Sequence, residues 1–525
     1  MKFSNLSQKL FRTKDIETIQ SEAQDGCGLK KTLGVIDLLG IGIGAIIGAG
    51  IFILTGQAAA QYAGPGIVIS FIVAAIVSGL AGLCYAEFAS MIPVAGSAYT
   101  YSYATLGEII AWFIGWDLII EYAIGASAVA VGWSSYVVSL LRQVGINVPP
   151  EFSSPPGTQF VFLSKATVAK MGILASDGWY QLGFYIQRLQ QAGISPDTLP
   201  HSTGLFNLPA ILVVLFVTII LVKGIKESAT FNTAIVIAKI AVILAVITVG
   251  IRFIQIANWV PFIPPNLGKY GEFGWSGVIR GAGVVFFAYV GFDAVSTAAQ
   301  EAKNPQTHMP IGILGSLVLC AALYVMFALV LTGVVNYSKL NVANPVALAV
   351  DATGIAWLAV FVKIGAIAGL TSVILVLLMG QARIFFSMAH DGLLPAFFSK
   401  AHPRFGTPAN TTMVTGLGVG ILASLLPVGV LAELVSIGTL AAFIVVCAGV
   451  LVLRYKNPCM PRPFRAPGVP FVPILGVLSC LSLALSLPWE AWLRLLSWLA
   501  IGFVIYFFYG IRHSHQRKLR RDEQL

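Results

Sequence analysis

The chain has 525 residues, of which 57% are hydrophobic and only 10% are charged. Soluble domains carry charge on about a quarter of their residues, so this composition excludes an ordinary soluble protein and predicts a membrane protein. The net charge of +10 gathers at the ends of apolar runs, as the positive-inside rule describes, and no aromatic-interleaved basic patch indicates nucleic-acid binding.

Residues 1–33 are polar and lack the apolar stretch of a signal peptide, so we expect a cytoplasmic N-terminal tail. The apolar runs that follow last about twenty residues, the length a helix needs to cross a bilayer core of about 30 Å. A barrel would instead need alternating strands of about ten residues. We therefore predict an all-α polytopic protein of about twelve transmembrane helices. These are expected near 35–60, 67–91, 109–141, 208–223, 230–251, 276–299, 310–335, 356–383, 411–427, 431–453, 470–487 and 492–511.

With the N-terminus inside, most lysines and arginines fall in cytoplasmic segments, which places both termini in the cytoplasm. The expected location is the inner (plasma) membrane.

The first span contains a glycine-rich stretch, Gly44-Ala-Ile-Ile-Gly-Ala-Gly-Ile-Phe52. Each glycine weakens a helix by about 1 kcal/mol relative to alanine. Unwound backbone at membrane depth is tolerated only where it faces protein or a watery cavity. Such a break exposes amide N–H groups suited to a carboxylate and carbonyls suited to an ammonium. The alternative is a small-residue packing face.

The third span carries Asp117 and Glu121, four residues apart and therefore on one helix face. One interpretation is a polar helix contact in which one acid is protonated. The other gives Asp117 a gating role and lets Glu121 meet a cationic side chain of the substrate. The residues alone favour neither.

The external segment 142–207 contains Pro149-Pro150 and Pro155-Pro156, and we expect a surface helix around 180–191. Nothing in this segment carries chemistry. A folded cap is therefore favoured over a gate or a partner site.

Lys239 lies near the middle of the fifth span, where a lysine costs about 2.5–3.5 kcal/mol on insertion scales. It can form a structural pair with a carbonyl or an acid, or it can gain and lose a proton during function. Ionisable groups inside the membrane are functional by default, so the second interpretation is favoured.

The sixth span places Gly291 and Asp293 within Phe-Phe-Ala-Tyr-Val-Gly-Phe-Asp (286–293). We expect a second break here, with Asp293 either capping the following half-helix or taking part in gating. Interruptions at corresponding positions of two halves are the best indication of a transporter site in a sequence.

The six cysteines are scattered, without metal-ligand spacing, and the predicted spans contain no histidine. We therefore expect no cofactor and no metal. A membrane-embedded enzyme would need a nucleophile with a base, or clustered ligands, so it is the distant alternative.

Several long segments resemble the amino acid–polyamine–organocation superfamily, and within it the bacterial cationic amino acid transporter branch. They are GIGAIIGAGIF (42–52), CYAEFASMIPVAGSAYTYSYATLGE (84–108), FFAYVGFDAVSTAAQE (286–301), GQARIFFSMAHDGLLPAFFSKAHPRFGTP (380–408) and PRPFRAPGVP (461–470). This resemblance implies a LeuT-like five-plus-five inverted repeat. Its parts would be a first repeat at 34–255, a second at 256–455, two additional helices at 456–511 and a basic cytoplasmic tail at 512–525.

The same resemblance implies roles for individual residues. Amides of Gly48, Ala49 and Gly50 would bind the substrate carboxylate. The α-ammonium would be bound by carbonyls of Ile46, Phe287, Ala288 and Val290, with Phe287 as an aromatic lid. The ammonium of Lys239 would take the place of a sodium ion between the first break and Thr371-Ser372. Gln300 departs from the glutamate expected beside Glu301.

The expected function is a proton-coupled secondary transporter of amino acids, cationic or small neutral, that works by alternating access. The alternative is a sodium-independent exchanger or facilitator with the same site. The expected partners are an amino acid, protons and the lipid bilayer.

Overall fold

The computed structural model describes residues 11–15, 19, 33–94, 96–171, 177–223, 226–342, 344–400, 402–403 and 407–514. Most of the N-terminal tail and of the basic C-terminal tail thus lies outside the described residues.

Helical structure covers each of the predicted spans. The elements are α3 (Val35–Ile46), α4 (Thr55–Ala58), α5 (Ile67–Met91), α6 (Ser97–Thr105), α7 (Glu108–Ile119), α8 (Gly125–Gln143), α11 (Leu208–Lys223), α12 (Lys226–Gly250), α13 (Gly274–Val285), α14 (Ala294–Thr297), α15 (Pro305–Val334), α16 (Pro345–Asp351), α17 (Ala356–His390), α18 (Ala409–Leu425), α19 (Val428–Lys456), α20 (Phe471–Ser486), α21 (Trp489–Ile505) and α22 (Ile511–His513).

Within the described part of the chain, eight helical segments are long and apolar enough to cross a membrane, and three shorter apolar helices accompany them. One of the eight, Val35–Met91, has 57 residues. At 1.5 Å per residue a straight helix of that length would far exceed a bilayer. It contains the segment Gly64–Gly66, where Gly64 has φ +59°. The chain is a multi-pass membrane protein, while the number of twelve crossings stays a prediction.

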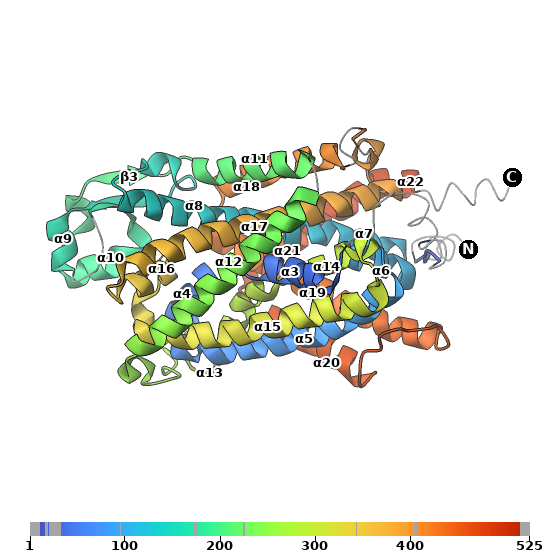
Figure 1. Ribbon diagram of the computed structural model, residues 1–525, viewed down its shortest axis with the longest axis horizontal. Coiled ribbons are helices and arrows are strands. Elements are labelled where there is room, and N and C mark those ends of the chain that lie inside the picture. Colours follow the sequence, from blue (N-terminus) through green and yellow to red (C-terminus); the bar gives the residue numbers. More distant parts are fainter. Residues whose placement is uncertain are drawn as a thin grey trace.

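The helices form two packed groups (Figure 1). In the first group α15 packs along α5 and α3, and α13 packs on α5. In the second group α17 packs against α8, and α18 and α19 also contact α8. α12 touches α3, α15 and α17, and so lies between the groups. α20 contacts both α19 and α5.

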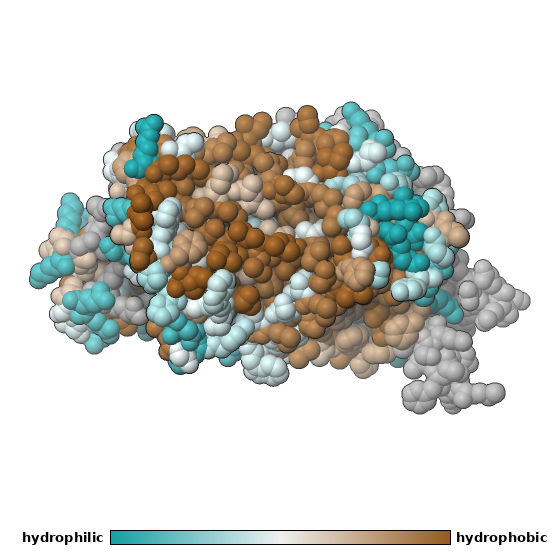
Figure 2. Space-filling view, turned by 90° about the horizontal axis from the view of Figure 1, so that it is seen from below, coloured by the Kyte–Doolittle hydropathy of each residue, from teal (hydrophilic) through white to brown (hydrophobic). Residues whose placement is uncertain are grey.

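The surface between the two ends of the molecule is strongly apolar (Figure 2). On α11, Leu212, Leu215, Phe216 and Ile219 are all exposed. A soluble monomer rarely exposes so large an apolar area. In this membrane protein, the acyl chains of the lipid cover that area.

The segment between α8 and α11 forms a small domain at one end of the molecule (Figure 1). Its antiparallel sheet has the order β2-β1-β3, built from β1 (Gln159–Leu163), β2 (Gly178–Gln181) and β3 (His201–Thr203). Two helices accompany it, α9 (Lys165–Lys170) and α10 (Leu182–Gln191). The surface helix expected around 180–191 is confirmed. The all-α prediction is wrong for this segment, because short strands there pair around a separate core that includes Val161, Leu163 and Val342.

We call this end the sheet face. The opposite end, where α6 and α22 lie, is called the terminal face (Figure 1).

Candidate functional site

The first predicted break is present. α3 ends at Ile46, and Ile47 leaves helical geometry with φ −75° and ψ 98°. Helical structure resumes at Ala49 and continues as a π-helix from Gly50 to Leu54. The first amides of a helix have no intrahelical partner. The break therefore leaves amide groups available at the start of the second half-helix.

The second predicted break is also present. After α13 the chain forms a 3-10 turn at Phe286–Tyr289, and Val290 is extended with ψ 135°. Gly291 then takes φ +112°, a region that residues with a Cβ rarely adopt. A Cβ at this position would also lie 2.8 Å from that of Ala45 on the first break, so both the backbone angle and the contact require glycine.

The two breaks meet at a small cavity. The residues that line it are Ala45, Ile46, Gly48, Ala49, Gly50, Gly125, Val129, Phe287, Val290, Val373 and Leu377. Its free volume for a water-sized sphere is about 10 Å³, which is room for about one water molecule. The site is therefore contracted in this conformation.

Six of the eight residues predicted to bind substrate line this cavity. Ala288 and Glu121 do not. A Cβ at Gly50 would collide with Ala288, so the two breaks touch directly at this point.

Tyr324 on α15 joins the two breaks. Its hydroxyl lies 2.8 Å from the carbonyl oxygen of Ile46 and 3.0 Å from that of Ala288. Both carbonyls were predicted to receive the α-ammonium, and in this conformation the tyrosine hydroxyl is their partner. The sequence reasoning missed Tyr324, because a tyrosine inside an apolar span carries no distinguishing pattern.

Lys239 is fully buried and lies behind the first break. Its ammonium donates hydrogen bonds to the carbonyls of Gly44 (2.7 Å) and Ile47 (3.0 Å). It also donates to the hydroxyl of Ser372 on α17 (3.1 Å). The lysine thus ties the broken helix of the first group to the second group of helices.

Thr371, predicted beside Ser372, takes different partners. Its hydroxyl accepts a hydrogen bond from Trp133 and donates one to the carbonyl of Ile367.

A buried group of acids lies beside the second break. Asp293 accepts a hydrogen bond from the Tyr122 hydroxyl, and Glu121, next to Tyr122 in the chain, is also buried. Asp293 is the N-cap residue of α14, although its side chain makes no capping hydrogen bond to that helix. Asp117 is also buried, and its carboxyl has no hydrogen-bond partner within the described residues.

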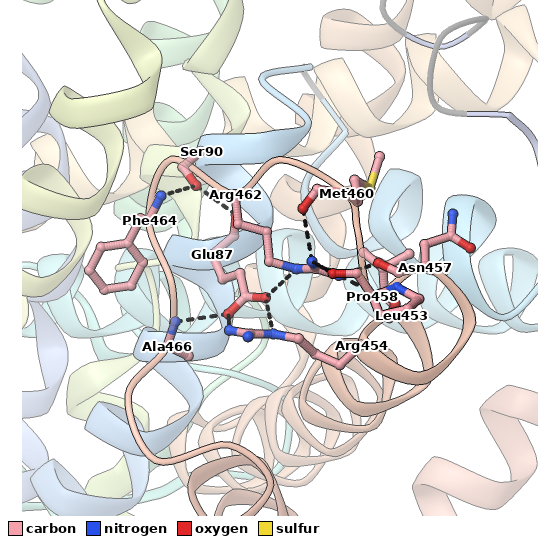
Figure 3. A network of polar contacts seen from close by, with 10 residues as sticks. All are labelled: Glu87, Ser90, Leu453, Arg454, Asn457, Pro458, Met460, Arg462, Phe464 and Ala466. Atoms are coloured by element: carbon pink, nitrogen blue, oxygen red, sulfur yellow. Dashed lines mark hydrogen bonds and ion pairs between the residues drawn. The ribbon is translucent and has the colours of Figure 1, made fainter.

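Two ion pairs connect the two helix groups at the terminal face. Glu301, which follows α14, binds Arg383 of α17. Glu87 of α5 binds Arg454 of α19 through two hydrogen bonds of 2.9 and 2.8 Å (Figure 3). Another ion pair, Glu433–Arg494, connects α19 to α21 and does not cross between the groups.

Residues 33–511 match the family described as amino acid permease. Two proteins of Bacillus subtilis (strain 168) are each 44% identical to the chain, over 96% of it and 98% of their own length: the methylthioribose transporter and the branched-chain amino acid permease BcaP. The vacuolar cationic amino acid transporter 4 of Arabidopsis thaliana is 38% identical over 86% of this chain and 68% of its own length. The family match includes both broken helices and Lys239.

Proposed function

The chain belongs to the amino acid permease family, and from that premise we propose that it is a proton-coupled secondary transporter of amino acids that works by alternating access. The observation that carries the proposal is the meeting of two broken helices at a buried cavity. The family membership indicates a transporter and not an enzyme.

The backbone of the two breaks suits both ends of an amino acid. Gly48, Ala49 and Gly50 open the second half of the first broken helix and line the cavity. Their amides, with the positive end of the helix dipole, bind the carboxylate. The carbonyls of Ile46, Phe287, Ala288 and Val290 receive the α-ammonium, whose three donors replace the single hydroxyl of Tyr324.

The lining of the cavity favours a neutral aliphatic side chain. Gly125, Val129, Val373 and Leu377 face the space beyond the backbone groups, and the cavity has no charged lining residue. Glu121, the acid that a cationic substrate would need, lies outside the lining. The similarity to the branched-chain permease BcaP agrees with this choice, while the similarity to a cationic amino acid transporter supports a cationic substrate.

Lys239 couples the site to the proton. Its ammonium holds the carbonyls of Gly44 and Ile47 against Ser372. Loss of the proton removes the charge that binds these carbonyls, which frees the first broken helix to move relative to α17. Thr371, which precedes Ser372 on α17, adds a second hydroxyl beside it. A sodium-independent exchanger would use the same site without this titration.

Alternating access moves the first helix group against the second. The first group combines α3 and α5 with α13 and α15. It thus takes two helices from each of two inverted repeats at 34–255 and 256–455, and the helices of 456–511 are added outside. The terminal face is cytoplasmic, and its ion pairs Glu301–Arg383 and Glu87–Arg454 close that side. Asp117 and Asp293 take part in gating, and 142–207 caps the opposite side.

The substrate class is tested by competition. Each of the twenty amino acids, and methylthioribose, is added in excess against labelled leucine in proteoliposomes. We expect isoleucine, valine and leucine to compete best. Stronger competition by arginine and lysine would contradict the neutral substrate. Competition by methylthioribose alone would contradict amino acid transport.

Gly48→Leu should abolish binding. A Cβ at this position already lies 2.9 Å from Val373, and the rest of the leucine side chain would fill the cavity. We expect leucine affinity to fall at least about a hundredfold, or 2.7 kcal/mol, measured on purified protein. Gly79→Ala is the control, because a Cβ there meets nothing. Retained affinity in Gly48→Leu would show that the carboxylate binds elsewhere.

Lys239→Ala should abolish accumulation driven by a pH gradient. The matched control is Lys363→Ala, which removes another buried lysine from a helix, and it should accumulate substrate. Accumulation is measured in proteoliposomes with an inward proton gradient. If Lys239→Ala accumulates substrate like the unmodified protein, Lys239 has no part in coupling. If the unmodified protein exchanges substrate but its accumulation does not depend on the proton gradient, the protein is an exchanger and not a proton-coupled transporter.

Glu301→Gln should open the terminal face. Losing one charge-assisted pair of about 1.5–3 kcal/mol should raise the open population about tenfold or more. Spin labels are placed at positions 303 and 455, which are both exposed. The distance between the two labels, measured by double electron–electron resonance, reports the separation of the two helix groups. Glu433→Gln breaks the pair that does not cross and should leave the distances unchanged. Identical distance distributions for both variants would contradict the role of Glu301.

A further inference from the structure

The connection from α19 to α20 carries unusually one-sided charge. Four cations lie between positions 434 and 489, namely Arg454, Lys456, Arg462 and Arg465, and this stretch contains no aspartate or glutamate. All four lie at the terminal face, where α19 ends and the chain turns back into α20.

Two of these cations are used inside the protein. Arg462 donates hydrogen bonds to the carbonyl of Leu453 near the end of α19 and to those of Asn457, Pro458 and Met460, which follow this helix (Figure 3). Arg462 also approaches Glu87 to 3.3 Å.

Glu87 is the acid that this segment contacts, and it is already saturated. Its side chain is 2% exposed. It receives two hydrogen bonds from Arg454 and a third from the amide of Ala466 (2.8 Å) (Figure 3). One acid therefore compensates the charge of only one of these four cations.

The other two cations point outward. Lys456 and Arg465 are exposed. Among the described residues, the Lys456 ammonium reaches only the carbonyl of Thr105, at 3.4 Å, and Arg465 has no hydrogen-bond or ion-pair partner. Burial is the main cause that lowers the pKa of Arg462, and the charges of Arg454 and Arg465 lower it further. The local excess of positive charge thus disfavours the charged form of the buried Arg462.

An apolar surface follows these cations along the chain. On α20, Phe471, Leu475, Leu478 and Leu485 are exposed by 52% or more, and their spacing places them along one side of the helix. Tyr455, between the two cations Arg454 and Lys456, is 80% exposed. Aromatic residues of this kind occupy the membrane interface.

We propose that Lys456 and Arg465, with the outer side of α20, form a binding site for one acidic phospholipid. The phosphate of the headgroup lies between the two exposed cations, and the acyl chains lie along the stripe from Phe471 to Leu485. Basic pockets at helix ends on one membrane side bind anionic headgroups in this way. A free phosphate would use the cations but would gain nothing from the stripe, so the occupant is a lipid.

The test measures which lipid stays with the purified full-length protein. Protein in nanodiscs of equal phosphatidylglycerol and phosphatidylcholine is transferred to detergent, and bound lipids are counted by native mass spectrometry. We expect phosphatidylglycerol to be enriched at least threefold over phosphatidylcholine. The double variant Lys456→Gln/Arg465→Gln should lose this enrichment.

A matched control removes one lysine and one arginine from the opposite end. Lys339 and Arg252 are exposed, and Lys339→Gln/Arg252→Gln should keep the enrichment. Arg465→Lys should also keep it, because the charge remains, which separates binding from misfolding. Equal enrichment in the unmodified protein and in the Lys456→Gln/Arg465→Gln variant would overturn the site. Displacement of the lipid by 10 mM glycerol phosphate would overturn the assignment to a lipid.

Discussion

The need to satisfy every backbone group inside the membrane governs this structure. An unbroken helix meets that need by itself, whereas the breaks at Ile47 and Val290 leave amides and carbonyls without helical partners. Polar side chains from other helices replace those partners. Lys239 binds the carbonyls of Gly44 and Ile47, Tyr324 bridges those of Ile46 and Ala288, and Tyr136 donates to the carbonyl of Phe52. In this contracted conformation, the backbone carbonyls at the breaks are thereby kept hydrogen-bonded to side chains.

The two faces of the molecule are closed by different interactions. At the terminal face, charged pairs such as Glu301–Arg383 connect the two helix groups. At the sheet face, α4 and the helical turn after it (Ala59–Ala63) are joined to the loop before α16 by uncharged hydrogen bonds, from Gln57 to the carbonyl of Val342 and from Gln61 to Asn341. Val342 also packs into the core of the small sheet domain. Charge-assisted bonds are the stronger of the two kinds, which fits a conformation that is held more firmly at the terminal face.

Sequence alone predicted the features that are costly in lipid. Glycines 44–50, Gly291 and Lys239 stand out because an apolar helix has no reason to contain them, and the structure places them together. It did not predict Tyr324 or Tyr122, because tyrosine is common in membrane helices and its partners lie far away in sequence. Asp293 was assigned in part to a local cap, but its partner Tyr122 is 171 residues away. The sheet of 159–203 was also missed, because its strands have only three to five residues.

The central claim is that the two breaks hold the two charged ends of an amino acid. The most direct measurement is the affinity of the purified protein for leucine and for two analogues, one without the carboxylate (isopentylamine) and one without the ammonium (4-methylpentanoate). Each analogue loses charge-assisted hydrogen bonds, and its affinity should fall about tenfold to a hundredfold. If either analogue binds as tightly as leucine, the corresponding break does not recognise the substrate.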